Sequence, residues 1–231
     1  MALVAIFGTT ISPYLFFWQA GQEVEERHRR HAKPLCITPR QAGPELRRIR
    51  NDTLTGMGFS NVTALSIVMA TAATLHASGI TEIQSAQQAA SALRPIAGEF
   101  AFALFALGII GTGLLAVPVL AGSAAYAVSE TFRWTEGLDR APREAKAFYT
   151  AIALATLGGV ALNLIDIDPM KALYWSAVVN GLLAPPLMVV TMMIARNSRV
   201  MGRLVISRRL ALGGWLSTAA MSAVALLFLF G

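Results

Sequence analysis

The stretch IFGTTISPYLFFWQAGQEVEE, residues 6–26, decides the fold that this chain is expected to adopt. It begins with apolar side chains, as a membrane helix does, and it becomes apolar again after residue 14. Between these parts, residues 8–14 read GTTISPY, which places several hydroxyl side chains and a proline inside the apolar run. An apolar run with this interruption predicts a first membrane span that is broken near residues 9–14.

The residues of the interruption are of the types that weaken a helix. Pro13 lacks a backbone N–H, and its ring clashes with the carbonyl group four residues earlier. Gly8 adds backbone freedom, and the hydroxyls of Thr9, Thr10 and Ser12 can bond to nearby backbone groups in an unwound segment. A simple proline kink is one interpretation. Polar residues on both sides of the proline favour a second one, a discontinuous helix whose oxygens coordinate an ion near the bilayer midplane.

The composition of the chain is that of a membrane protein. It is 55% hydrophobic and 14% charged, whereas a soluble domain is about a quarter charged. Its apolar residues form runs of about 20, the length that crosses a bilayer core of about 30 Å. We therefore predict an all-α, polytopic membrane helix bundle in a single transmembrane domain, residues 1–231. Its six spans are expected at about 1–20, 55–77, 97–127, 147–165, 170–194 and 210–230.

Basic residues are confined almost entirely to alternate connections between these spans. Residues 22–54, 128–146 and 196–209 together hold 17 of the 19 Lys and Arg residues. Loops rich in Lys and Arg face the cytoplasm, so these three are predicted to be cytoplasmic in a multi-pass protein of the plasma membrane, with 22–54 as a basic loop. Solvated ion pairs are expected in this loop between Glu23, Glu25, Glu26 and Arg27, Arg29, Arg30. This topology also accounts for the net charge of +6, and nucleic acid is not expected as a partner.

Three stretches of the chain resemble the Nramp family of divalent metal ion transporters, in a divergent, magnesium-transporting-like branch. They are GTTISPYLFFWQAGQEVEE (8–26), GIIGTGLLAVPVLAGSAAYAVSE (108–130) and ALYWSAVVNGLLAPPLMVV (172–190). The first is fairly specific, and the other two support it. The resemblance covers nearly the whole chain, as the C-terminal half of a leucine-transporter-type fold. It implies that the first five spans form the second inverted repeat of that fold.

The family motif, Ala-Thr-Val-Met-Pro-His in better-known members, aligns with residues 9–14. The resemblance implies that the metal ligands lie here, at Thr9, Thr10, Ser12 and Tyr14. Ser12 replaces the family methionine and offers a hard oxygen instead of a soft sulfur, which favours Mg²⁺, with Mn²⁺ as the second choice. The transported ion is thus the substrate, and no cofactor is expected.

Tyr14 replaces the family histidine, and tyrosine does not titrate near neutral pH. If transport is coupled to protons, His76 and Glu99 are the candidate carriers, although both suit an interfacial position without a role in transport. Asn180 is a further candidate metal ligand, since it precedes Pro185 and Pro186 in the fifth span. It could equally bond a neighbouring helix.

The family site also contains an aspartate in a broken first helix, and no span of this chain has a carboxylate near its centre. With basic loops inside, the first span starts at the outer face, so Met1 is expected to be an internal methionine or a mis-assigned start, or else a separate chain supplies the first half. The expected partners are therefore the missing N-terminal half of the transporter, the lipid bilayer and the divalent ion. The alternatives are a fragment or subunit that does not transport, and an enzyme, for which the sequence holds no motif.

Overall fold

A computed structural model describes residues 2–77, 79–81, 83, 85–164 and 168–230 of the chain. Within these ranges the regular structure is helical and contains no strand. The predicted all-α class is thereby confirmed. The expected start at Met1 and the predicted boundary at residue 165 lie outside the described residues.

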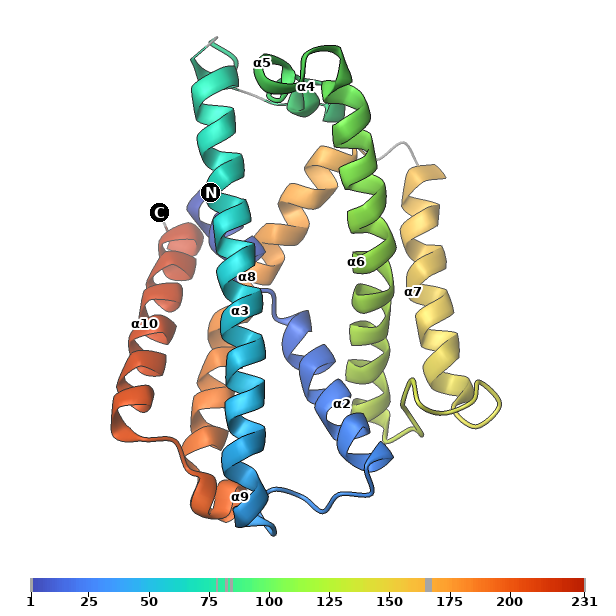
Figure 1. The fold of residues 1–231 in the computed structure, drawn as a ribbon, viewed down its shortest axis with the longest axis vertical. Coiled ribbons are helices and arrows are strands. Elements are labelled where there is room, and N and C mark those ends of the chain that lie inside the picture. The colour runs from blue at the N-terminus through green and yellow to red at the C-terminus, as the bar shows by residue number, and fades with distance from the viewer. Residues whose placement is uncertain (1, 78, 82, 84, 165–167, 231) are drawn as a thin grey trace. The chain divides into compact units, whose positions relative to one another are not determined.

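The described part of the chain forms a series of helices joined by short connections (Figure 1). The α-helices are α1 (Ala2–Thr10), α2 (Tyr14–Arg29), α3 (Pro39–Thr71), α4 (Ala86–Ser91), α5 (Arg94–Ala97), α6 (Ala101–Phe132), α7 (Lys146–Leu164), α8 (Pro169–Arg196), α9 (Ser198–Met201) and α10 (Arg208–Phe230). A π-helical turn, η1 (Ala72–His76), continues α3, and the 3₁₀ turns η2 (Gly98–Phe100) and η3 (Gly202–Leu204) precede α6 and follow α9.

Four helical segments within the described ranges are long and apolar enough to cross a membrane. They are Arg40–His76, Gly98–Phe132, Pro169–Arg196 and Arg208–Phe230, and they correspond to the second, third, fifth and sixth predicted spans. The fourth predicted span lies in α7 (Lys146–Leu164). Its apolar part, Lys146–Leu162, is shorter than the four segments above. The first predicted span consists of the two helices α1 and α2.

The connection predicted at 22–54 is mostly helical, which differs from the loop that the sequence suggested. α2 continues to Arg29, and α3 begins at Pro39. Opposite charges one turn apart stabilise such helix ends, as in the pairs Glu26–Arg30 and Glu45–Arg48. The charge pattern indicated a solvated segment, but it did not distinguish a loop from a helical extension.

The chain divides into two compact units, residues 1–43 with 120–231, and residues 44–119. The second unit contains most of α3, with η1, α4, α5, η2 and the first part of α6. Apolar side chains such as Phe59 and Leu114 are exposed along α3 and α6, which suits helices that face lipid. The short polar helix α4 is capped at its start by Ser85, whose side chain accepts a bond from Gln88 N.

Within the first unit, α1 packs against α8 and α10. Val4, Ala5 and Val178 form a buried apolar cluster, and Val224 and Phe228 of α10 pack against it. α8 remains one helix through Pro185 and Pro186 and changes direction near its middle (Figure 1). The bend is expected because a proline in a helix removes a hydrogen bond and displaces the preceding turn.

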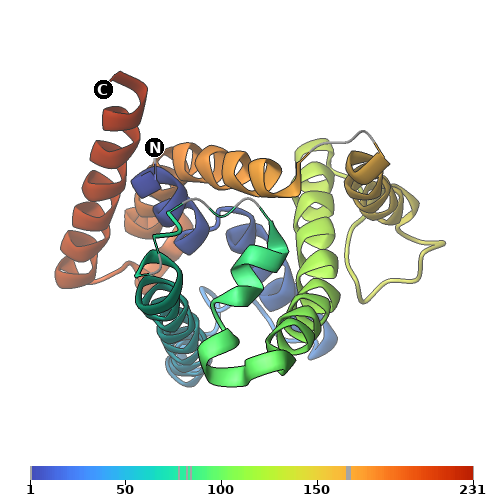
Figure 2. The ribbon, with the colours of Figure 1, turned by 90° about the horizontal axis from the view of Figure 1, so that it is seen from above.

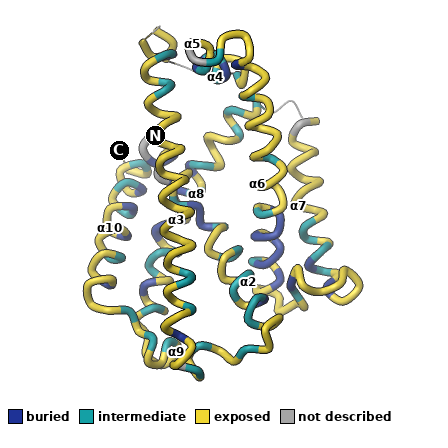
Figure 3. Tube along the Cα trace, in the orientation of Figure 1, coloured by how far each residue is buried: buried dark blue, intermediate teal, exposed yellow. Residues whose placement is uncertain are grey.

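A second cluster in the same unit joins α2 to the end of α6 and to α7. Ala125, Tyr126, Ala145 and Phe148 are its buried members, and Trp18 of α2 packs against them. Seen from above, α7 and α10 lie on opposite sides of the unit (Figure 2). The dark blue segments in Figure 3 mark buried residues near the middle of α8 and in the last turns of α6.

Candidate ion site at the helix break

The first span is interrupted at residues 11–13, as predicted. α1 ends at Thr10, and α2 begins at Tyr14. Pro13 occupies the position before the first residue of α2 with φ −55°, a value that its ring already imposes. The proline therefore ends one helix and starts the next, and the predicted discontinuous helix is present.

The hydroxyl groups of the break are bonded to the helix that precedes them. Thr9 Oγ1 donates to the carbonyl oxygen of Ala5 (2.7 Å), and Thr10 Oγ1 donates to that of Ile6 (2.8 Å). Ser12 is 8% exposed, and its Oγ lies 3.2 Å from the carbonyl oxygen of Thr9. Each hydroxyl donates its hydrogen bond to a carbonyl oxygen and still has oxygen lone pairs that can face a cation.

The two half-helices create opposite partial charges at the break. The carbonyl end of α1 carries partial negative charge, and the N–H end of α2 carries partial positive charge. The carbonyl oxygens of Ser12 and Pro13 accept bonds from Leu15 N (3.0 Å) and Phe16 N (3.1 Å), which start α2. A cation is therefore favoured on the α1 side of the break, next to Thr9.

Gly8 has a different role from the one that the sequence suggested. It lies inside α1, and a Cβ atom there would collide with the carbonyl oxygen of Ala177 and lie 2.6 Å from the backbone nitrogen of Gly181. A Cβ atom on Gly181 would likewise lie 2.6 Å from the carbonyl oxygen of Val4. The two glycines allow the backbones of α1 and α8 to touch, so Gly8 fixes the position of the broken helix instead of loosening it.

Asn180 is half-buried and precedes Gly181, at which α8 contacts α1. It therefore lies within one helical turn of the crossing of the two helices. Tyr14 is also half-buried and is the first residue of α2. The metal-ligand prediction for these two residues is not tested by their positions.

The two candidate proton carriers lie in the second unit, and both are exposed. His76 ends the π-helical turn η1, and Glu99 lies in the 3₁₀ turn η2 before α6. Asp168 caps the start of α8, because its Oδ1 accepts a bond from Met170 N at 2.9 Å. Asp166, two residues earlier, lies outside the described residues.

The donors of the break are uncharged. Among the described residues, no three His, Cys, Asp or Glu side chains gather into a group that could hold a metal ion. A dication held by neutral oxygens alone is poorly compensated in a medium of low dielectric constant. The break therefore offers neutral oxygen donors, and its own side chains supply no negative charge.

Sequence reasoning missed a buried carboxylate on α2. Glu25 was expected to form a solvated ion pair, but it is 4% exposed and accepts hydrogen bonds from Tyr126 and the loop after α6. Glu136 of the same loop has a raised pKa because of partial burial and the nearby charges of Glu130 and Glu25. The available signal was the spacing of Trp18, Gly21 and Glu25, which lie on one helix face.

The sequence profile of one protein family, Nramp, described as natural resistance-associated macrophage protein-like, matches residues 1–231. No curated protein matches the chain.

Proposed function

The chain belongs to the Nramp family, which implies divalent metal ion transport, and from this premise we propose that its first five spans form the second inverted repeat of a secondary transporter. The substrate ion binds at the break between α1 and α2. The observation that carries this proposal is the interruption at residues 11–13, which contains the buried Ser12. Non-helical backbone within a membrane span persists only where protein or a wet cavity surrounds it.

The proposed ligands are oxygens on the α1 side of the break. Thr9, Ser12 and the last carbonyl groups of α1 supply the first ligands, because the partial charge of that helix end is negative. Thr10, Tyr14 and Asn180 complete the polar lining. The contact of Gly8 with α8 supports the inclusion of Asn180, since it brings α1 within a turn of that residue.

Mg²⁺ is the proposed substrate, with Mn²⁺ as the second choice. The buried side chain of the break is Ser12, a hard oxygen donor, and thioether sulfur is the donor that favours the later transition metals. Small side chains at residues 9 and 12 suit a partly hydrated ion, and Mg²⁺ gives up its water slowly. Tyr14 stands at the position of the family histidine, so we propose no proton coupling through the break.

The proposal includes a carboxylate from a segment outside residues 1–231. Neutral oxygens leave the charge of a dication uncompensated, so the opposing wall of the site must carry negative charge. Residues 1–231 alone are then expected neither to transport nor to catalyse a reaction. The basic segments 22–54, 128–146 and 196–209 are proposed to face the cytoplasm from a plasma membrane.

The test is uptake of Mg²⁺ and Mn²⁺ into proteoliposomes by the transporter that contains residues 1–231. Replacement of Ser12 by Ala should lower the uptake of both ions at least about tenfold, a loss of about 1.4 kcal/mol of transition-state binding. Ser222→Ala is the control, because Ser222 is half-buried and its hydroxyl, like that of Ser12, bonds a nearby backbone carbonyl. Equal uptake by both variants would contradict the proposed site.

A further inference from the structure

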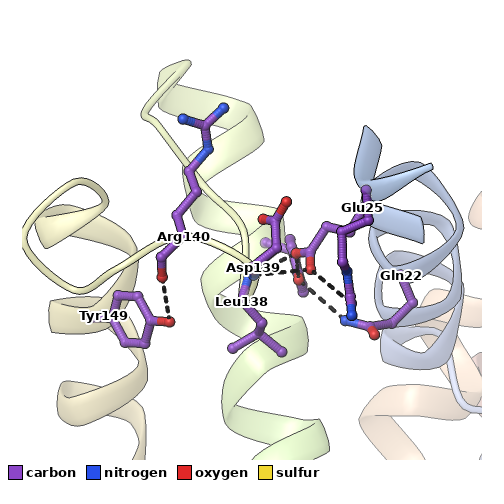
Figure 4. A network of polar contacts seen from close by, with 8 residues as sticks. Gln22, Glu25, Leu138, Asp139, Arg140 and Tyr149 are labelled. Atoms are coloured by element: carbon purple, nitrogen blue, oxygen red, sulfur yellow. Dashed lines mark hydrogen bonds and ion pairs between the residues drawn. The ribbon is translucent and has the colours of Figure 1, made fainter. Parts of the chain in front are cut away.

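Among the described residues of the first unit, Glu25 is the carboxylate that is buried. It lies on α2 and is 4% exposed. Its carboxylate accepts a hydrogen bond from the hydroxyl of Tyr126 on α6, and bonds from the backbone nitrogens of Leu138 (2.7 Å) and Asp139 (3.2 Å). Figure 4 shows Leu138 and Asp139 of the loop beside Glu25. One side chain thus joins α2 to α6 and to the loop that leads to α7.

The loop is shaped around this carboxylate. Gly137 has φ +130°, a conformation that favours glycine. A Cβ atom at Gly137 would collide with Asp139 Oδ1 and lie 3.3 Å from Glu25 Oε1. The glycine therefore lets the chain turn closely enough for the next two N–H groups to reach the carboxylate.

The remaining polar neighbours contribute less. Gln22 Nε2 donates to the Tyr126 hydroxyl at 3.3 Å, and Arg29 lies 3.9 Å from Glu25 with an exposed side chain. An exposed ion pair at this separation adds little stability. The charge of Glu25 is therefore compensated chiefly by the Tyr126 hydroxyl and the two N–H groups of the loop.

Aromatic rings also pack where Glu25 joins α2 to α6. The ring of Tyr126 lies 6.1 Å from that of Trp18 and 4.9 Å from that of Phe148, measured between centroids. A Cβ atom on Gly21 would lie 3.0 Å from the Tyr126 ring, and one on Gly122 would lie 2.5 Å from Trp18. α2 is therefore attached to α6 by close apolar contacts as well as by Glu25, and Tyr126 of α6 packs in turn on Phe148 of α7.

The other half of the broken span is attached elsewhere. α1 packs on α8 and α10, through Val4, Gly8 and Gly181. The two half-helices thus belong to different packing groups, and residues 11–13 connect them. A short non-helical segment between two attached elements is where a rotation of one against the other is absorbed.

We propose that Glu25 is a positioning residue for transport, which fixes α2 to α6 and α7 so that these elements move as one body. This inference rests on the proposed function, since the movement is the one that opens and closes the ion site. Removal of a bonded partner from a buried carboxylate leaves unsatisfied polar groups and is costly. Bending at residues 11–13 breaks no such cluster, so the break flexes while the Glu25 contacts persist.

The inference is tested by pulsed electron–electron distance measurements between nitroxide labels on the full transporter in lipid. Labels replace Ala20 on α2 with either Leu157 on α7 or Leu216 on α10, in a Cys36→Ser background. All three positions are exposed. Saturating Mg²⁺ should leave the distance from Ala20 to Leu157 unchanged and should shift the distance from Ala20 to Leu216.

The same label pairs, measured without any ion, test the role of Glu25 directly. Glu25→Ala should at least double the width of the distance distribution between Ala20 and Leu157. Tyr126→Phe, which keeps the ring packing and removes one bond, should broaden it less and serves if the first variant does not fold. Arg29→Gln is the matched control and should leave the distribution as narrow as in the wild type.

Two results would overturn the inference. One is a wild-type distance from Ala20 to Leu157 that shifts with Mg²⁺ as much as the distance to Leu216. The other is a distribution that stays narrow in both Glu25→Ala and Tyr126→Phe. If Mg²⁺ shifts neither distance while Glu25→Ala broadens the first one, Glu25 still fixes α2, and the result contradicts the proposed ion site.

Discussion

The two halves of the broken span are held in different ways. α1 is apolar and is fixed by backbone contact with α8, which Gly8 and Gly181 permit. α2 is amphipathic and is fixed by a buried carboxylate and by aromatic rings. The difference shows that one apolar run in the sequence became two helices with separate partners. The break between them therefore connects two separately packed helices, and it is also the candidate ion site.

The largest expected effect comes from filling the contact between α1 and α8. Gly8→Leu places a side chain where a Cβ atom already meets backbone atoms of Ala177 and Gly181. Backbone cannot move aside as a flexible side chain can, so we expect a loss of about 3 kcal/mol in the free energy of unfolding. A thermal unfolding series in detergent measures it. Gly213→Leu is the control, because a Cβ atom at Gly213 meets nothing within 4 Å.

A smaller loss is expected when the attachment of α2 is cut. Glu25→Ala leaves the Tyr126 hydroxyl and two loop N–H groups without their acceptor. One or more of these groups stays shielded from water, so we expect a loss of about 2 kcal/mol. In the same thermal series, Glu26→Ala should cost far less, since Glu26 pairs with Arg30 at an exposed position. Equal losses would mean that burial of Glu25 contributes nothing.

The smallest expected effect depends on pH and concerns the loop that holds Glu25. The pKa of Glu136 is raised by its partial burial and then by Glu130 and Glu25. Because the folded protein binds this proton more tightly than the unfolded chain, the contribution of Glu136 to stability falls as pH rises through its folded pKa.

Glu136→Gln removes the negative charge that disfavours the folded state at higher pH. It should therefore stabilise the protein slightly at pH 7 and hardly at all at pH 4. Solvent screening keeps the gain small. The measurement is the unfolding temperature of both proteins across this range. The surrounding cavity of about 360 Å³ is also lined by His28, Arg133, Asp139 and Arg140, and His28→Gln controls for titration of the histidine. A stability gain of Glu136→Gln that is largest at low pH would contradict a raised pKa of Glu136.

The break was predictable because its cause is local. A proline alone does not end a helix, since Pro185 and Pro186 lie inside α8. Pro13 stands between hydroxyl side chains that stabilise an unwound turn, and this combination in residues 8–14 indicated the break. The role of Gly8 was not predictable, because a helical glycine that loosens a backbone and one that admits a neighbouring helix look alike in a sequence. The neighbour, Gly181, lies far along the chain.

Glu25 was misread for a related reason. Three glutamates followed by three arginines indicate solvated ion pairs, and Glu26 does form one. The burial of Glu25 depends on Tyr126 and on the turn at Gly137, which are more than 100 residues away. Long-range partners of this kind cannot be read from local charge spacing.

The most direct test of the central claim, that the break binds a hard divalent ion, is competition between Mg²⁺ and Mn²⁺. Binding of Mn²⁺ to the transporter in lipid is followed by electron paramagnetic resonance while Mg²⁺ is added. We predict that Mg²⁺ displaces Mn²⁺ from the wild type. Ser12→Met supplies a soft sulfur at the break and should raise the amount of Mg²⁺ needed about tenfold or more. An unchanged requirement in Ser12→Met, with binding intact, would show that the ion does not meet residue 12 and would contradict the account.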